Sequence, residues 1–324
     1  MYNWEEVRDL VNKFIDELQF EREPRELYAP IRYTIEQSGK RVRPVLFLMA
    51  YNMYKESLDG AFYPAVAVET YHNYTLIHDD VMDRASIRRG KPTVCAKWGD
   101  TAAILSGDTM LVLAYEFLSH VPADKLPAML SLFTETAKEI GDGQQYDLGF
   151  ETRDDVKEEE YMEMIRLKTS VLLAAALKLG GILADAPAED LENLYAYGER
   201  MGLAFQLQDD LLDVYADQAL FGKKIGGDIC CNKKTFLLIT AMNLASAEQL
   251  VTMKEWMEKS EFDADAKIAY FTNLYNELGV KGICERRIQA LFDECDGYME
   301  KLSVAPEKKR YLKEFADSLL NRNL

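Results

Sequence analysis

Hydrophobic residues recur mostly every three to four positions along the chain, the spacing of amphipathic helices. Runs in which apolar and polar residues alternate, as they do in half-buried strands, are few. Proline and glycine end most of the periodic segments, for example at Pro24, Gly60, Pro187 and Pro306. The pattern predicts an all-α bundle, with helices near residues 3–20, 25–38, 41–56, 62–83, 100–120, 124–150, 158–183, 188–215, 233–245, 247–260, 263–279, 283–302 and 306–321.

The domain organisation follows from length and composition. No Pro/Gly/Ser-rich linker divides the 324 residues, so we expect a single domain over 1–324. The longest apolar stretch, 171–183, is interrupted by Lys178 and is too short to cross a bilayer, and the N-terminus lacks the pattern of a signal peptide. We therefore expect a cytoplasmic protein without a transmembrane segment. Its five cysteines form no C-x-x-C pair, so reduced thiols are expected.

Two aspartate triplets of the form D-D-x-x-D end two long predicted helices, at 79–83 and 209–213. Because residues i and i+4 share a helix face, each triplet aims two carboxylates in one direction. A solvated acidic face is the ordinary explanation for such a cluster. The repetition of the motif and the apolar neighbours favour a metal site instead, and ligands that are all oxygen favour Mg²⁺ over Zn²⁺. The candidate ligands are Asp79, Asp80, Asp83, Asp209, Asp210 and Asp213.

The formal charge of −17 argues against nucleic acid or an anionic membrane as a partner. It would also repel an anionic substrate, so a phosphate site must be built from local basic clusters and bound cations. Such clusters occur at 40–43, 84–91, 223–224 and 233–234, near the triplets or in glycine-containing turns. Carboxylates on two opposed helices with basic loops between them would clamp a diphosphate through Mg²⁺, as a cofactor tail or as a leaving group.

Several motifs in order along the chain closely resemble the trans-isoprenyl diphosphate synthases, the polyprenyl synthetase family. They are Ser38-Gly39-Lys40-Arg41-Val42-Arg43-Pro44, His72, the first triplet, Arg88-Arg89-Gly90-Lys91-Pro92, Lys168-Thr169, Phe205-Gln206-x-x-Asp209-Asp210-x-x-Asp213 and Gly222-Lys223-x-x-Gly226-x-Asp228. Ser38 departs from the glycine frequent in the family. The resemblance implies the isoprenoid synthase fold, with a central cavity between two aspartate-bearing helices, and a homodimer.

The resemblance also implies the reaction. Isopentenyl diphosphate would condense head to tail with an allylic diphosphate (dimethylallyl, geranyl or farnesyl), to give farnesyl or geranylgeranyl diphosphate. Mg²⁺ and cationic side chains would stabilise the departing pyrophosphate, and the double bond of isopentenyl diphosphate would attack the allylic cation. Water must be excluded, because it would quench that cation.

The roles of individual residues carry over by position. Asp79, Asp83 and Asp209 would hold Mg²⁺, supported by Asp80, Asp210 and Asp213. The allylic diphosphate would be bound by Arg88, Lys168 and Lys223, although Lys224 competes with Lys223. The diphosphate of isopentenyl diphosphate would be bound by Lys40, Arg43, His72 and Arg89, with Lys233 assisting at the mouth. Thr169 and Gln206 would lie near the developing cation, and Asp147 either orders metal-bound water or is a surface residue.

Product length is expected to depend on the helix that carries the first triplet. Tyr74 and Tyr71 precede Asp79 by five and eight residues, which places them about 7.5 and 12 Å down the helix axis. They would floor a pocket for the growing tail, unless they only pack the core. Tyr74 followed by the small Thr75 is similar to the pattern of short-chain synthases making fifteen- or twenty-carbon products.

Two other readings remain at this point. A terpene cyclase or head-to-head synthase would share the fold and the first triplet, but cyclases usually replace the second triplet and have no use for the Lys40, Arg43 and His72 cluster. A non-catalytic regulatory subunit would typically have lost aspartates, whereas all six are present here. His78 and His120 are interpreted as structural residues.

Overall fold

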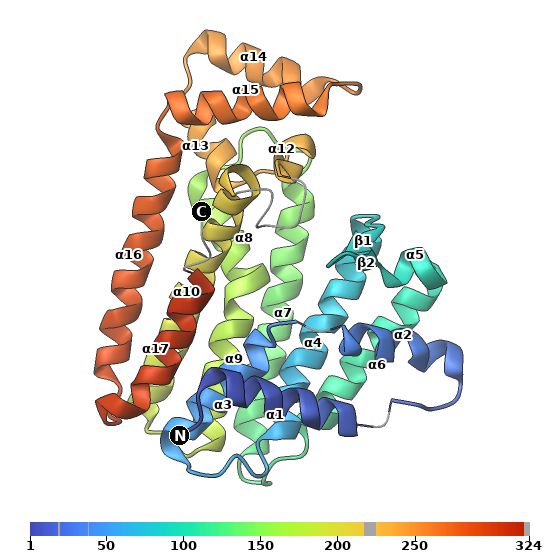
Figure 1. Ribbon diagram of the computed structural model, residues 1–324, viewed down its shortest axis with the longest axis vertical. Coiled ribbons are helices and arrows are strands. Elements are labelled where there is room, and N and C mark those ends of the chain that lie inside the picture. Colours follow the sequence, from blue (N-terminus) through green and yellow to red (C-terminus); the bar gives the residue numbers. More distant parts are fainter. Residues whose placement is uncertain (19, 38, 217–224, 321–324) are drawn as a thin grey trace. The chain divides into compact units, whose positions relative to one another are not determined.

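The computed structural model describes residues 1–18, 20–37, 39–216 and 225–320, and most of this chain is helical (Figure 1). Within those ranges the strands are β1 (Ile87–Arg88) and β2 (Lys91–Pro92), an antiparallel hairpin. The all-α prediction is confirmed. The helices are α1 (Trp4–Glu17), α2 (Arg25–Glu36), α3 (Val42–Tyr54), α4 (Phe62–Met82), α5 (Val94–Trp98), α6 (Asp100–Leu118), α7 (Leu126–Phe150), α8 (Glu158–Ile165), the π-helical turn η1 (Arg166–Ser170), α9 (Val171–Leu183), α10 (Ala188–Tyr215), α12 (Gly227–Cys230), α13 (Phe236–Leu244), α14 (Ala247–Glu258), α15 (Ala264–Glu277), α16 (Val280–Lys301) and α17 (Pro306–Leu320).

The predicted helix boundaries agree with the observed ones to within about three residues, and the range predicted for α10 coincides with it. The sequence did not predict α5, α12, the hairpin or η1. Helices α5 and α12 and the turn η1 each span five residues or fewer, and each strand of the hairpin has two residues, which is too short to show a hydrophobic period. All five cysteines are free thiols, as expected.

The chain forms two compact units, which are described separately. Unit 1 comprises Met1–Thr134, Ala175–Tyr195 and Leu302–Lys313, and unit 2 comprises Glu135–Ala174, Ala196–Lys301 and Glu314–Leu324. The first aspartate triplet belongs to unit 1 and the second to unit 2. The single domain over 1–324 and the opposition of the two triplets across a cavity therefore stay predictions.

Unit 1 is built around α3, which is apolar on all sides and buried from Pro44 to Met53 except at Tyr51. Helix α4 packs against α3 on one side and α6 on another, and α4 and α6 run side by side (Figure 1). At the end of α4 the chain turns into the β1–β2 hairpin. The turn is secured by the Ala85 amide, which donates to the Asp80 carbonyl at 2.9 Å. The hairpin is thereby held beside the first triplet.

Unit 2 contains α8, η1 and the first residues of α9 up to Ala174, the main part of α10, and helices α12 to α16. Helices α14 and α15 form a hairpin (Figure 1), with the rings of Trp256 and Tyr270 6.0 Å apart. Lys267 of α15 is fully buried and donates to Asn232 Oδ1 at 2.6 Å and to the Cys230 carbonyl at 3.4 Å. This contact ties α15 to the loop after α12, which leads to Lys233.

Helix α6 is long and apolar enough to cross a membrane by length and composition alone, and 44% of its most apolar 18-residue stretch is buried in the protein. Its buried face contacts α4, α2 and α5 in unit 1. The opposite face exposes Ile104, Leu105 and Val112. The apolar stretch 171–183, expected to be too short for a span, forms another helix, α9.

Candidate active site

The first aspartate triplet lies at the C-terminal end of α4, where Asp83 is the capping residue. Asp80 is 4% exposed and Asp83 is exposed. Arg88 of the hairpin donates from Nε to Asp80 Oδ1 at 2.8 Å and from Nη2 to Asp79 Oδ2 at 3.2 Å. Burial raises the pKa of Asp80, and the charge of Arg88 opposes that shift. Arg88, which is predicted to bind the allylic diphosphate, thus contacts Asp79 and Asp80, which are predicted to bind Mg²⁺.

The basic turn before α3 splits its side chains between solvent and core. Arg41 has φ 49°, a left-handed conformation, and its guanidinium is buried. It pairs with Glu69 Oε1 of α4 at 3.0 Å and donates to Asn12 Oδ1 and to the Ile35 carbonyl. Lys40 instead is exposed. The sequence predicted no role for Arg41 or Glu69, although a glutamate inside the apolar 64–71 segment is a usable signal.

Arg43, His72 and Arg89 belong to the same part of unit 1. Burial lowers the pKa of Arg43 to about 10, with Glu69 opposing the shift and Arg89 adding to it. Burial, together with Arg43, Arg89 and Arg88, lowers the pKa of His72 well below its usual value. Arg43 Nε is buried and, across the described ranges, has no hydrogen-bond partner. Arg43, His72 and Arg89 thus act on one another electrostatically, and the buried Nε of Arg43 has unused donor capacity; their binding of isopentenyl diphosphate stays a prediction.

An aromatic cluster lies behind the first triplet. The ring of Tyr71 is 5.4 Å from that of Tyr74 and 5.3 Å from that of Phe133, and Tyr115 meets Phe133 at 5.2 Å. Tyr71 is buried and Tyr74 is half-buried. Thr75, after Tyr74, donates its hydroxyl to the His72 carbonyl at 2.8 Å. The role of these tyrosines in setting product length stays a prediction.

The two histidines given a structural reading have structural contacts. His78 Nε2 lies 3.2 Å from the Ile104 carbonyl, and its ring occupies space that any side chain at Gly107 would fill. His120 Nδ1 lies 3.0 Å from the Glu116 carbonyl. The His120 ring also stacks on Tyr63 of α4 at 4.2 Å, so both histidines contact a neighbouring helix in unit 1.

The second triplet ends α10 in unit 2. Asp210 is 2% exposed and accepts hydrogen bonds from the Tyr161 hydroxyl at 2.5 Å and the Phe236 amide at 3.2 Å. Burial raises its pKa to about 7. Asp213 accepts from the Asp228 amide at 3.0 Å, and burial followed by the charge of Asp228 raises its pKa to about 6. Asp209 is half-buried.

The other candidates in unit 2 come from η1, α7, α10 and the loop after α12. Lys168 Nζ lies 2.6 Å from Asp147 Oδ2, so Asp147 is not an isolated surface aspartate. Thr169 Oγ1 lies 3.4 Å from Gln206 Oε1. Lys233 Nζ lies 3.8 Å from Asp228. The predicted ligand Lys223, its competitor Lys224 and the departure at Ser38 fall outside the described residues.

Carboxylates at the ends of two long helices, with arginine and lysine side chains beside them, are groups that can hold a phosphate through a cation. The sequence profile of the polyprenyl synthetase family matches residues 24–275, and the chain belongs to this family. It is 44% identical over 233 residues to geranylgeranyl diphosphate synthase from Methanosarcina mazei, covering 71% of this chain and 72% of that protein. It is 35% identical over 317 residues to geranylgeranyl pyrophosphate synthase from Geoglobus acetivorans, covering 97% and 96%.

Among solved structures, the chain is similar to the crystal structure of geranylgeranyl pyrophosphate synthetase from Pyrococcus horikoshii Ot3. The TM-score is 0.92 at 32% identity, over 99% of this chain and 98% of that one. These findings confirm the expected class, a short-chain trans-isoprenyl diphosphate synthase and thus a prenyltransferase. They do not favour a terpene cyclase or a regulatory subunit.

Proposed function

We propose that the protein condenses isopentenyl diphosphate head to tail with dimethylallyl, geranyl and farnesyl diphosphates in a Mg²⁺-dependent reaction that releases pyrophosphate. We further propose a twenty-carbon main product. Two of the most similar relatives carry the name of a geranylgeranyl synthase and span two thirds or more of this chain, which supports that length over fifteen carbons.

The observation that carries the proposal is the buried Nε of the half-buried Arg43 side chain. Its pKa of about 10 keeps it protonated at neutral pH, and its Nε is a donor without an acceptor among the described residues. A buried charged donor of this kind is costly unless an anion satisfies it. Lys40, His72 and Arg89 would complete the site for the diphosphate of isopentenyl diphosphate. Because the pKa of His72 is low, it would act as a neutral imidazole until the anion arrives.

The donor atoms also fit Mg²⁺. Asp79, Asp83 and Asp209 offer carboxylate oxygens that are at least partly exposed, and these are the ligands that Mg²⁺ prefers. Over the described ranges no group of three or more His, Cys, Asp or Glu side chains lies close enough to hold a metal alone. Mg²⁺ in phosphate-binding sites is usually held by one or two carboxylates together with the phosphates. The chemistry that Mg²⁺ would supply is neutralisation of charge on the departing pyrophosphate.

The remaining acidic side chains would support these ligands. Asp80 and Asp210 are buried against Arg88 and Tyr161, and Asp213 holds the Asp228 amide. Such contacts fix the helix ends from which the neighbouring carboxylates project.

Cationic and hydroxyl side chains would bind and orient the allylic substrate. Arg88 and Lys168 each contact an aspartate and would exchange part of that contact for diphosphate oxygens. Lys223 would bind the same diphosphate, and Lys233 would assist at the mouth. Thr169 and Gln206, with their side-chain oxygens 3.4 Å apart, would face the carbon that becomes cationic. Tyr74, Tyr71 and Thr75 would limit the length of the tail.

The exposed apolar face of α6 supports a homodimer. Ile104, Leu105 and Val112 are 44%, 54% and 66% exposed on one helix, and a second copy of the chain would cover them. Such a pairing also accounts for the apolar composition of α6 without a membrane. We therefore propose a cytoplasmic homodimer of a chain that forms one domain over 1–324.

The test of the proposed function is Mg²⁺-dependent pyrophosphate release by Asp79→Ala and Asp209→Ala. Each change should lower turnover by roughly 100- to 1000-fold, because each removes a group that supports charge on the leaving pyrophosphate. Asp16→Ala, at an exposed aspartate on α1, is the matched control and should retain normal turnover. Near-normal turnover in both triplet variants would overturn the assignment.

A further inference from the structure

The helix that carries Lys168 and Thr169 is not regular. Residues Arg166–Ser170 form the π-helical turn η1 between α8 and α9, and the Val171 amide donates to the Arg166 carbonyl, five residues back. A π turn holds one more residue than an α turn, is rare, and occurs frequently at functional sites. Two of its five residues are those assigned above to the allylic substrate. What keeps this turn in its unusual form therefore bears on the reaction.

Two glycines bring neighbouring backbones against η1. A Cβ atom on Gly143 of α7 would lie 2.4 Å from the Lys168 amide nitrogen. A Cβ atom on Gly202 of α10 would lie 2.6 Å from the Ser170 Cα. Neither distance can accommodate a side chain, so η1 is in backbone contact with both helices. Both contacts are made to residues of the π turn.

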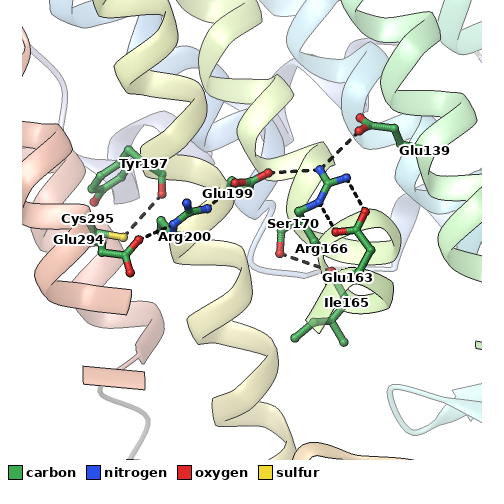
Figure 2. Close-up of polar contacts among 10 residues, drawn as sticks. All are labelled: Glu139, Glu163, Ile165, Arg166, Ser170, Tyr197, Glu199, Arg200, Glu294 and Cys295. Atoms are coloured by element: carbon green, nitrogen blue, oxygen red, sulfur yellow. Dashed lines mark hydrogen bonds and ion pairs between the residues drawn. The ribbon is translucent and has the colours of Figure 1, made fainter. Parts of the chain in front are cut away.

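The side chain of Arg166 connects the same helices (Figure 2). Its Nε and Nη2 donate to the two carboxylate oxygens of Glu163, each at 2.8 Å. Its Nη1 lies 3.4 Å from Glu139 Oε1 of α7 and 3.2 Å from Glu199 Oε1 of α10. One guanidinium therefore holds carboxylates from α8, α7 and α10.

The acidic partners and the glycines share helix faces. Glu139 precedes Gly143 by four residues on α7, and Glu199 precedes Gly202 by three on α10, spacings that place each pair on one side of its helix. Helices α7 and α10 thus each contact η1 twice: once through the backbone of a glycine, and once through a glutamate that pairs with Arg166. Without the guanidinium, the half-buried carboxylates of Glu139 and Glu199 would face each other and the exposed Glu163, and would repel.

We propose that Arg166 is a positioning residue of the prenyl transfer, which holds η1 in its π form by drawing Glu139 and Glu199 onto one guanidinium. This inference rests on the proposed roles of Lys168 and Thr169. If η1 relaxed to an α turn, the register on one side would change by one residue, a rotation of about 100°. Lys168 would then leave Asp147, and Thr169 would leave Gln206. Arg166 itself does not need to touch the substrate.

A second arginine on the same network provides a matched control (Figure 2). Arg200 contacts Glu199 and also donates to Glu294 of α16, with Nε and Oε2 2.5 Å apart. Its side chain is 27% exposed and that of Arg166 is 25% exposed. Arg200→Met removes a cation of similar burial from the same network, but one whose ion pairs are with α10 and α16 rather than with η1. It controls for the general loss of an ion pair.

The experiment measures kcat, KM and thermal stability for Arg166→Met, Arg166→Lys and Arg200→Met. We expect Arg166→Met to lower kcat by roughly 100-fold, the effect of a displaced reacting group, with KM for isopentenyl diphosphate within about threefold. Arg166→Lys should recover part of the kcat, because the lysine ammonium restores the positive charge but cannot donate to several carboxylates in the fixed planar geometry of the guanidinium. Arg200→Met should keep kcat within about threefold. Equal kcat losses in Arg166→Met and Arg200→Met would overturn the proposal.

A double-mutant cycle separates positioning from a general structural role. If Arg166 acts through η1, Arg166→Met should lower kcat little further in a Lys168→Ala, Thr169→Ala background. If Arg166→Met lowers kcat in that background as much as it does alone, the inference is overturned. If the Lys168→Ala, Thr169→Ala variant itself keeps normal turnover, the proposed site is overturned instead. If Arg166→Met does not fold, Glu199→Gln keeps the shape of the side chain and should lower kcat by about tenfold; an unchanged kcat would count against the proposal.

Discussion

Replacing Arg41 with methionine should destabilise the protein because it leaves Glu69 buried without its closest cation. The two side chains are 3% and 7% exposed, and their N–O distance is 3.0 Å. At an effective dielectric constant of about 20, that distance corresponds to an attraction of about 5–6 kcal/mol. Removing one partner of a buried pair typically costs about 3–5 kcal/mol. Since Arg43 and Arg89 also act on Glu69, we expect the lower end, about 3 kcal/mol.

Denaturant unfolding of Arg41→Met beside Arg32→Met measures this cost. Arg32 also pairs with two glutamates, Glu36 and Glu21, but its side chain is 45% exposed, so its loss should cost far less than the loss of Arg41. The same free-energy change in both variants would refute the argument from burial.

A double variant tests whether Arg41 also orients the basic turn. Arg41→Met combined with Glu69→Leu removes both charges and should recover most of the stability. It should not recover binding, because the turn that presents Lys40 and Arg43 has lost the contacts of Arg41 to Asn12 and Ile35. We therefore expect KM for isopentenyl diphosphate to stay raised in the double variant. A normal KM would show that Arg41 serves stability alone.

Two further changes test the environment of α4. The pKa of His72 is lowered in the folded state, so the protein should lose stability as pH falls below about 6.5, by up to about 1.4 kcal/mol per pH unit. Unfolding experiments at pH 7 and pH 5 should show that His72→Gln lacks this part of the loss. An equal loss of stability in the variant and the unchanged protein would contradict the lowered pKa. Tyr74→Ala should lengthen the product seen by chromatography while Tyr74→Phe leaves it unchanged, and an unchanged product in the alanine variant would remove Tyr74 from the floor of the tail pocket.

The sequence predicted the long helices well because their hydrophobic period and their proline and glycine boundaries agree. It also predicted that Asp79 and Asp80 would end one helix and Asp209 to Asp213 another, since the spacing i, i+4 is a local property. It could not show which of these carboxylates would be held by hydrogen bonds from other parts of the chain. The hydroxyl of Tyr161 reaches Asp210 from 49 residues away, and no local pattern encodes that contact.

The π turn illustrates the same limit. Residues 158–183 have a helical hydrophobic pattern throughout, and the extra residue in η1 depends on Gly143 and Gly202, which lie on other helices. Likewise, the sequence shows Lys40, Arg41 and Arg43 only as three neighbouring basic residues and does not indicate which of them is buried. Only the left-handed backbone at Arg41 sends its guanidinium into the core while Lys40 faces solvent.

The most direct test of the proposed activity is chromatography of the products formed from labelled isopentenyl diphosphate with dimethylallyl, geranyl or farnesyl diphosphate as primer. With Mg²⁺ present, all three primers should be extended to the same twenty-carbon diphosphate, and a chelator should abolish the incorporation of label. Failure to incorporate label from any primer in the presence of Mg²⁺, or a product ladder that continues to thirty carbons and beyond, would contradict the proposed function.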